Sequence, residues 1–458
     1  MTSTRGRVPT GYADEIVISE ASFRTQHRAI ESASEPHTKK RKREEKGDPS
    51  VVYGAGAYKG PWARYEEEQP ETSSGEDEVS EYEEDGIQPQ PAPPSKSGTD
   101  YDQSSAEKES TEFLGLEQYD YQGRTYMHVP QDLGIDLRSD PTETKNFVPK
   151  KLIHTWHAST GGSAASGGGK AITQMRFFPD SGHLLLSAAA DSKVKIWDTY
   201  HQRELLRSYS GHSKSVNDID FRHDGIQFLS ASFDRQMKLW DTETGACISR
   251  FTTGKTPHVI RFNPSIPHEF LAGTSDKKIV QFDTRSGALV QEYDHHLGPV
   301  NTITFCDEDR RFMTTSDDRS LRAWEYGIPV PIKFIAEPYM FSMVRSSPHP
   351  KGKYVAYQSS DNQITVYAST ERFRQNRKKS FRGHNIAGYA IDVAISPSGD
   401  LVMSGDSGGF VCFWDWKSCK MYHKIQASDS PVVACVWQPR TTSRCVTGDL
   451  NGLIKLWD

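Results

Sequence analysis

Two sets of side chains in this sequence have the residue types and the spacing of a catalytic site. The sets are His212, Ser230, Asp234 and Trp240, and then His296, Thr314, Asp318 and Trp324. A serine, a histidine and an aspartate could form a nucleophilic triad, although a triad is defined by its geometry. Because the sets recur, each with 22 residues from histidine to aspartate, we interpret them as a structural device. Hydrogen bonds from His to Asp and Ser, and from Trp to Ser, would satisfy polar groups that a packed sheet would otherwise bury bare.

Both sets belong to a unit that recurs to the end of the chain. The aromatic residue that marks each copy stands at positions 197, 240, 282, 324, 367, 414 and 457, a spacing of 42 to 47 residues. Each copy contains an alternating apolar run after a turn, which predicts a strand. A period of about 40–45 residues with Gly-His and Trp-Asp dipeptides is typical of the WD40 repeat, in which four strands form one propeller blade. The sequence therefore predicts an all-β fold, a seven-bladed WD40 β-propeller over residues 150–458.

The two ends of the repeat region predict how the ring closes. Residues 150–157 (KKLIHTWH) resemble the outer strand that precedes the Gly-His turn of the second copy, whereas the sequence stops after an inner strand of the seventh copy. We expect residues 151–156 to pair beside residues 452–457, because this pairing hides two open sheet edges.

Several copies depart from the ideal unit. Gly254 and Tyr339 stand where a tetrad histidine is expected, and Gly408 and Asn451 replace the aspartate. The copy that ends at position 414 is the longest, and it carries six cations: Arg372, Arg374, Arg377, Lys378, Lys379 and Arg382. We expect the first five in a lengthened turn, with Arg382 following, before an outer strand near residues 379–381, on the face opposite the Gly-His turns. A solvated charged turn and a grip on phosphates or an acidic partner both remain open.

The N-terminal third differs from the rest in charge and composition. Residues 1–150 hold 18 Lys and Arg against 30 Asp and Glu, whereas residues 151–458 hold 37 against 31. Residues 1–110 are rich in Ser, Pro, Glu and Gly, which predicts a long, largely disordered arm. Within it, Lys39, Lys40, Arg41, Lys42 and Arg43 form a run of the nuclear-localisation type, although a solvated charge cluster has the same composition. We favour nuclear import, because a receptor could reach this run.

Three further segments precede the propeller. Residues 51–65 (VVYGAGAYKGPWARY) contain Trp62, which we expect to anchor the arm on a partner surface; the alternative is a stray aromatic residue. Among residues 66–85, 11 are acidic, and Ser73 and Ser74 resemble acidophilic-kinase sites, although such a run also serves solubility. Hydrophobic residues return after position 110, and we expect residues 111–149 to pack on the propeller as irregular structure.

Other features limit the class of function. The six cysteines have no CxxC spacing, which favours free thiols in a reducing compartment over disulfides or zinc. Residues 161–170 (GGSAASGGGK) fail as a phosphate-binding loop, because Ala164 and Ala171 replace required residues. No apolar run approaches 18 residues. We therefore expect no cofactor, no small-molecule substrate and no membrane partner.

Several stretches together resemble the pre-mRNA-processing factor 17 family of spliceosomal WD-repeat proteins. They are residues 59–63 (KGPWA), 120–137 (DYQGRTYMHVPQDLGIDL), 228–251 (FLSASFDRQMKLWDTETGACISRF), 275–280 (SDKKIV), 294–302 (DHHLGPVNT) and 452–458 (GLIKLWD). The second stretch is specific, because no propeller requires it. The resemblance implies a nuclear scaffold, not a catalyst, that acts around exon ligation, with splicing proteins as partners and snRNA or pre-mRNA nearby.

Two other classes of function compete with a splicing scaffold. A WD-repeat adaptor of another nuclear complex, such as a ubiquitin-ligase substrate receptor or a chromatin reader, would need a ligase-binding domain or an aromatic cage, and neither is plain. A propeller enzyme would need a nucleophile, a base and oxyanion donors grouped outside the tetrads. Composition and repeats leave the scaffold and the adaptor close, and the resemblance favours the scaffold.

Overall fold

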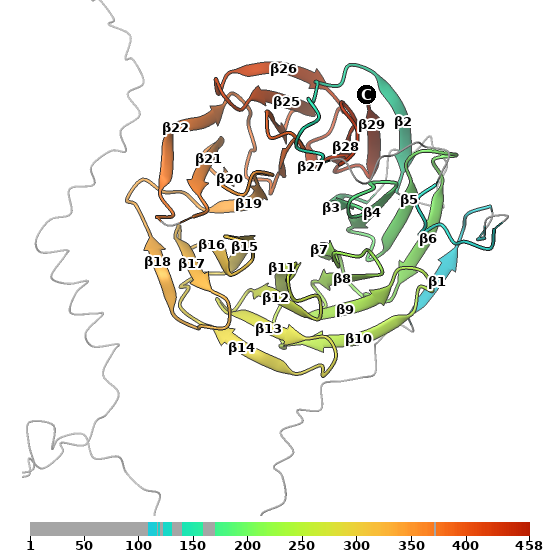
Figure 1. The fold of residues 1–458 in the computed structure, drawn as a ribbon, viewed down its shortest axis with the longest axis horizontal. Helices are drawn as coiled ribbons and strands as arrows, with labels where there is room; N and C mark the ends of the chain where they lie inside the picture. Colours follow the sequence, from blue (N-terminus) through green and yellow to red (C-terminus); the bar gives the residue numbers. More distant parts are fainter. Residues whose placement is uncertain (1–108, 117, 120–121, 131–139, 159–169, 371) are drawn as a thin grey trace, which may run out of the picture. The chain divides into compact units, whose positions relative to one another are not determined.

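In the computed structural model of the chain, the structure describes residues 109–116, 118–119, 122–130, 140–158, 170–370 and 372–458. These residues form 29 β-strands, grouped in seven sheets that stand around a central axis (Figure 1). The prediction of a seven-bladed propeller is confirmed. We number the blades from β3–β6, which form blade 1, to β27–β29, which form blade 7 together with β2.

Each blade has four consecutive positions from the axis to the rim. The innermost strands are β3 (Ile172–Phe177), β7 (Val216–Phe221), β11 (Pro257–Phe262), β15 (Val300–Cys306), β19 (Met343–Pro348), β23 (Val393–Ile395) and β27 (Val432–Trp437). The second strands are β4 (Leu184–Ala189), β8 (Gln227–Ser232), β12 (Glu269–Thr274), β16 (Arg311–Ser316), β20 (Tyr354–Ser359), β24 (Leu401–Gly405) and β28 (Cys445–Asp449). The third strands are β5 (Val194–Asp198), β9 (Gln236–Asp241), β13 (Ile279–Asp283), β17 (Leu321–Glu325), β21 (Gln363–Ala368), β25 (Phe410–Asp415) and β29 (Leu453–Trp457). The outer strands are β6 (Leu205–Ser210), β10 (Cys247–Thr252), β14 (Leu289–Tyr293), β18 (Pro331–Ile335), β22 (Gln375–Arg382), β26 (Met421–Gln426) and β2 (Leu152–His157).

The turn between the second and third strands requires a left-handed residue in every blade. The φ angles there are 67° at Ser192, 69° at Arg235, 74° at Lys277, 59° at Arg319, 62° at Asn362, 80° at Gly409 and 77° at Gly452. Residues other than glycine rarely adopt such angles, so neighbouring side chains must hold the turn. In blade 2, Asp234 Oδ1 accepts a hydrogen bond of 2.9 Å from the backbone N–H of Gln236. The aspartate of the repeat therefore fixes this turn.

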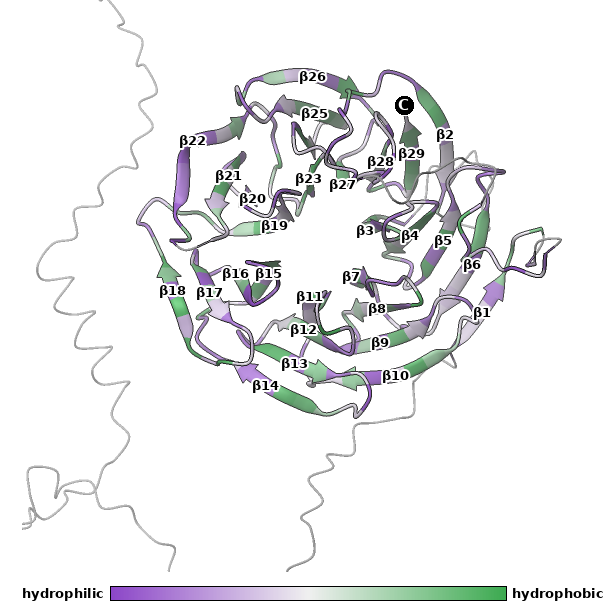
Figure 2. Ribbon diagram, viewed as in Figure 1, coloured by the Kyte–Doolittle hydropathy of each residue, from purple (hydrophilic) through white to green (hydrophobic). Residues whose placement is uncertain are grey.

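Apolar side chains fill the space between neighbouring blades, and each of the seven blade pairs encloses a cluster. Between blades 7 and 1, for example, Trp156 packs near Trp197 and Ile454, all of them buried. Burying one such large side chain contributes about 1.5–3 kcal/mol. Every blade is therefore packed against both of its neighbours. Figure 2 shows the hydrophobic and hydrophilic stretches alternating along the strands.

The ring is closed by the strand that precedes the first repeat. β2 pairs antiparallel with β29, with Trp156 opposite Ile454 and Leu152 opposite Trp457. The indole Nε1 of Trp156 also donates a hydrogen bond of 2.7 Å to the backbone carbonyl of Arg203 in blade 1. β2 thus completes blade 7 and contacts blade 1 (Figure 1).

One element differs from the irregular structure that was expected for residues 111–149. β1 (Ser110–Phe113) is a strand that pairs with β6, so that blade 1 has five strands. The four-residue run STEF has too little alternation to predict a strand, and the open edge of β6 supplies its backbone partners. The first residue of β1 is Ser110, so regular structure begins at the last residue of the arm that was predicted to be disordered. Farther along, the backbone N–H of Phe147 donates a hydrogen bond of 2.7 Å to the carbonyl of Thr442.

Candidate functional site

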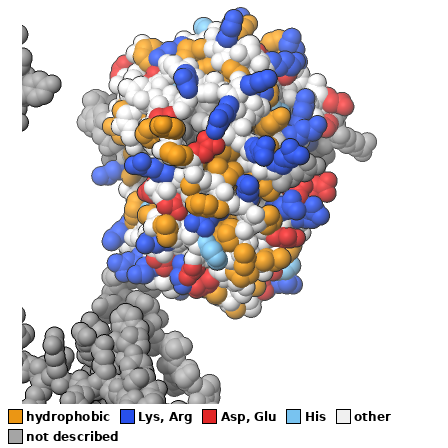
Figure 3. All heavy atoms as spheres, turned by 90° about the vertical axis from the view of Figure 1, so that its left-hand side faces the viewer, with side chains coloured by type: hydrophobic (Ala, Val, Ile, Leu, Met, Phe, Trp, Pro, Cys, Tyr) orange, Lys and Arg blue, Asp and Glu red, His pale blue; other side chains and the backbone are white. Residues whose placement is uncertain are grey.

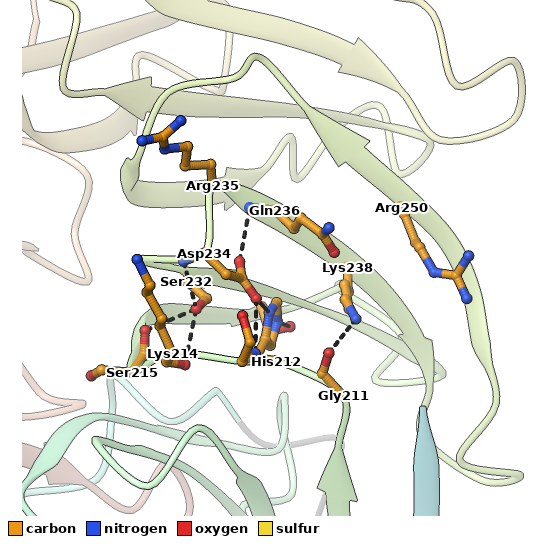
Figure 4. A network of polar contacts seen from close by, with 12 residues as sticks. Gly211, His212, Lys214, Ser215, Ser232, Asp234, Arg235, Gln236, Lys238 and Arg250 are labelled. Atoms are coloured by element: carbon orange, nitrogen blue, oxygen red, sulfur yellow. Dashed lines mark hydrogen bonds and ion pairs between the residues drawn. The ribbon is translucent and has the colours of Figure 1, made fainter. Parts of the chain in front are cut away.

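The two tetrads are assembled within blades 2 and 4. In blade 2, His212 Nδ1 lies 2.8 Å from Asp234 Oδ2, and His212 Nε2 lies 2.7 Å from Ser230 Oγ. Trp240 Nε1 donates a hydrogen bond of 2.9 Å to the same Ser230 oxygen. Figure 4 shows His212 and Asp234 facing each other beside the turn that Gln236 follows. In blade 4, the corresponding distances are 3.1 Å from His296 to Asp318, 2.8 Å from His296 to Thr314, and 2.9 Å from Trp324 to Thr314.

Burial decides what these tetrads can do. Ser230 is 0% exposed and His212 is 1% exposed, so no substrate reaches the hydroxyl. Burial also acts to raise the pKa of Asp318, but hydrogen bonds from His296 and Ser320 outweigh it and leave the pKa below its ordinary value. For His296, burial lowers the pKa against the opposing effect of Asp318. These groups are polar supports of the blade, and the geometry argues against a nucleophilic triad.

The degenerate copies replace the tetrad with other contacts. In blade 6, where Gly408 takes the aspartate's place, Trp414 Nε1 donates a hydrogen bond of 3.0 Å to the carbonyl of Arg382. His384 Nε2 lies 3.1 Å from Gln358 Oε1 of blade 5, and burial lowers the pKa of His384 to about 4. Without the aspartate, the histidine thus binds to the neighbouring blade.

A network of opposite charges lies on or beside the innermost strands. Arg261 Nη1 donates a hydrogen bond of 2.5 Å to Asp218 Oδ2, and Arg345 Nε lies 3.3 Å from Asp392 Oδ1. Arg176 and Asp220 face each other across 4.0 Å. Four of these residues, Arg176, Asp220, Arg261 and Asp392, line a cavity of about 810 Å³. Because three cations here face three carboxylates, we interpret the network as a tie between blades.

The first five cations of the longest copy do not share one turn, so that expectation was wrong. β22 begins at Gln375, which leaves Arg372 and Arg374 in the turn and places the others on the outer strand of blade 5. Thr365 pairs with Ser380 and Tyr367 with Gln375, so residues 376–379 stand opposite one residue of β21. The extra residues are therefore taken up as a β-bulge, because the strand pairing continues on both sides of them.

Three of these cations have specific contacts. Arg377 Nη2 lies 3.0 Å from Glu337 Oε2, and Arg382 Nε donates a hydrogen bond of 3.0 Å to Gln363 Oε1. Lys379 Nζ donates a hydrogen bond of 2.6 Å to the carbonyl of Trp416 and lies 4.9 Å from the centre of its indole ring. The side chains of Arg372, Arg374, Arg377, Lys378 and Arg382 are exposed. We call residues 372–382 the basic rim. Figure 3 faces this side of the propeller and shows Lys and Arg gathered over its upper half, at the height of β22.

The predicted sites in the arm lie outside the described residues. They are the basic run Lys39, Lys40, Arg41, Lys42 and Arg43, the anchor Trp62, and the serines Ser73 and Ser74.

The segment before the propeller makes contacts with blades 1 and 2 that the repeat pattern does not predict. Glu109 lies 2.8 Å from Lys238 Nζ and accepts a hydrogen bond of 2.6 Å from Arg250 Nε. Arg250, together with Lys238, lowers the pKa of Glu109 to about 2. Tyr126, from the DYQGRTYMHVPQDLG stretch, donates a hydrogen bond of 2.5 Å to the carbonyl of Thr242. The sequence marked that stretch only as a family signature. Its contacts were not predicted, because Tyr126 and Thr242 are distant in the sequence.

Among the residues that the structure describes, no group of three or more His, Cys, Asp or Glu side chains is placed to hold a metal ion. Within the same ranges, no helix has the length and apolarity needed to cross a bilayer. The six cysteines are free thiols: Cys247 and Cys419 are partly exposed, and Cys306, Cys412, Cys435 and Cys445 are buried.

The fold and its buried tetrads define a WD40 β-propeller. The family model described as "WD domain, G-beta repeat" matches residues 154–198, 203–241, 287–325 and 375–415. The chain is 47% identical over 441 residues to Pre-mRNA-processing factor 17 of Homo sapiens, covering 96% of this chain and 73% of that protein. It is 33% identical over 443 residues to the protein of the same name from Saccharomyces cerevisiae, covering 96% and 92%. WD repeat-containing protein 25 of Mus musculus is 26% identical over 282 residues, covering 60% and 53%. The chain belongs to the pre-mRNA-processing factor 17 family.

Proposed function

We propose that this protein acts in pre-mRNA splicing as a non-catalytic scaffold of the spliceosome. The observation that carries the proposal is the 47% identity over 96% of the chain to a human protein named for pre-mRNA processing. The 33% identity to the yeast protein of the same name supports a role common to distant eukaryotes. A nuclear location follows from this role, and the basic run of Lys39, Lys40, Arg41, Lys42 and Arg43 is consistent with it.

The propeller suits a platform better than an enzyme. The side chains that resemble a triad are buried and held by one another. Binding partners would instead use the loops and rims, where conformation varies without cost to the core. We therefore assign the scaffold role to the outer surface, with splicing proteins as partners.

The basic rim supports a position near snRNA or pre-mRNA. Arginine can grip two phosphate oxygens at once, and most of the rim cations are exposed. The rim therefore offers phosphate contacts of the kind that dominate affinity for nucleic acids.

The arm would extend the scaffold beyond the propeller. A tryptophan in an arm of this composition is the type of residue that anchors a segment on a partner. If Trp62 is such an anchor, Trp62→Ala should weaken incorporation into the spliceosome by about 2 kcal/mol. Equal incorporation of the variant and the unmodified chain, measured by co-purification, would reduce Trp62 to a bystander.

We place the action of the protein around exon ligation, the second catalytic step. The test is a splicing extract from the source organism, depleted of the protein and supplied again with the recombinant chain. The depleted extract should complete the first step and accumulate lariat intermediate and free 5′ exon, and the added chain should restore ligation. A block before the first step, or normal splicing after depletion, would contradict this placement.

A further inference from the structure

Exposed aromatic side chains lie beside the basic rim, on the outer side of blades 4 and 5. Tyr339 is 91% exposed, Phe334 is 54% exposed and Phe341 is 47% exposed. They belong to β18 and to the loop that leads from β18 to β19. Figure 2 shows β18 with hydrophobic colouring beside the hydrophilic part of β22. Isolated exposed apolar residues are ordinary, but three aromatic rings next to a row of cations are a composite surface.

Direct contacts connect the aromatic residues to the cations. A shallow crevice of about 50 Å³ is lined by Glu337, Tyr339, Phe341 and Gln363. Arg377 forms an ion pair with Glu337, and Arg382 donates a hydrogen bond to Gln363. Two rim cations thus hold residues of the crevice that Tyr339 and Phe341 line. The crevice has room for little more than a water molecule, so a flat ligand would lie on the rings and not inside.

We propose that this surface binds single-stranded RNA, with phosphates on Arg374, Arg377, Lys378 and Arg382 and with bases stacked on Tyr339 and Phe341. The proposal rests on the proposed function and assigns its RNA contact to particular residues. Proteins bind single strands through a positively charged track combined with aromatic rings, and the stacking tolerates any base sequence. A duplex hides its bases, so exposed rings would contribute nothing to binding it.

Glu337 has a distinct part in this site. Its carboxylate neutralises Arg377 in the free protein and would compete with an incoming phosphate. Both partners are well exposed, so the ion pair is weak and easily exchanged. Glu337→Gln should therefore strengthen RNA binding, an effect opposite to that of the other substitutions.

The experiment measures binding of the full chain to a labelled oligouridylate of about twelve nucleotides, by fluorescence anisotropy at several salt concentrations. The double variant Tyr339→Ala, Phe341→Ala should bind at least about fivefold more weakly, with an unchanged salt slope. Neutralising Arg374, Arg377 and Arg382 should lower the log–log salt slope by about 0.7 for each lost phosphate contact. The matched control is Tyr119→Ala, since Tyr119 is another exposed aromatic residue, 58% exposed and placed beside blade 1.

Binding by the double variant equal to that of the Tyr119→Ala control would overturn the stacking site, while depletion and rescue of splicing would still test the scaffold role separately. Equal weakening for single strands and for a duplex of the same sequence would also overturn it. If the double variant lost only a protein crosslink in the assembled spliceosome, the surface would belong to a protein partner. Thermal melting would verify that the variants are folded.

Discussion

Blades 4 and 5 are neighbours with the same strand order, yet they use the same position of the repeat in opposite ways. In blade 4 the position is His296, which is 4% exposed and held by Asp318 and Thr314. In blade 5 it is Tyr339, which is 91% exposed. In blade 4 the complete tetrad holds its histidine inside the blade, whereas Tyr339 of blade 5 stands at the surface. Loss of the tetrad does not expose this position in every blade, because His384 of blade 6 stays buried beside Gln358. The residue that occupies a degenerate position, and not degeneracy alone, therefore decides whether that position becomes part of the exposed surface.

The largest loss of stability should come from opening the ring, in which both blades are packed between neighbours. Deletion of residues 150–157 removes β2, exposes the edge of β29 and uncovers the cluster around Trp156. We expect the cooperative thermal transition of the propeller to be lost or lowered by tens of degrees. Calorimetry would measure it, with deletion of residues 109–113 as the comparison. That deletion removes β1 and the ion pairs of Glu109 but leaves the four strands β3–β6 of blade 1 in place, so it should cost less. A deletion of β2 that melts like the unmodified chain would show that the ring does not need it.

The next largest effect should be a difference in stability between a substitution at a buried tetrad histidine and one at the exposed Tyr339. His212→Ala leaves Asp234 and Ser230 without their buried partner, which costs about 1–3 kcal/mol for an unsatisfied group. Tyr339→Ala should change stability by less than about 0.5 kcal/mol, as for other exposed sites. Denaturant titration would measure both. Comparable losses at the two positions would remove the distinction between an inward tetrad and an outward loop.

Lowering the pH should destabilise the fold, because burial lowers the pKa of His384 and of His296. Between about pH 6.5 and about pH 4, the unfolded chain protonates the residue at position 384, whereas folded His384 stays neutral because burial lowers its pKa to about 4. The unfolded state then binds more protons, so stability falls with falling pH by up to about 1.4 kcal/mol per pH unit from this group. His384→Gln should flatten that part of the profile. In blade 4, Asp318 adds a loss at lower pH, since its depressed pKa makes it stabilise only as a carboxylate. An unchanged slope in the His384→Gln variant would contradict the assignment.

The smallest effect should be on the stability of rim variants. Replacing Arg372, Arg374 and Arg377 with glutamine should alter the free energy of unfolding by no more than about 0.5 kcal/mol, because exposed ion pairs contribute little. Lys214→Gln on blade 2 is a comparable exposed control. A loss of several kcal/mol in the triple variant would mean that the rim supports the fold, which would weaken the case for a binding surface.

Repetition explains how much of the fold was predictable. The seven aromatic positions predicted seven blades, because each copy repeats one local set of contacts. β1 was missed, since its strand conformation depends on the edge of β6 and not on its own four residues. The β-bulge of β22 was taken for a longer turn, because sequence length reveals an insertion without showing on which side of the pairing it lies. Tyr339 had a signal, its place at the tetrad histidine position, but exposure was not deducible from it.

The most direct test of the account is residue-resolved RNA crosslinking in the spliceosome assembled with this chain. We predict RNA crosslinks on the basic rim and on the loop around Tyr339 and Phe341, and none on the tetrad residues of blades 2 and 4, whose side chains are buried. RNA crosslinks confined to other blades, or only protein crosslinks at the rim, would contradict the claim that the basic rim and the loop around Tyr339 and Phe341 form the RNA-binding surface.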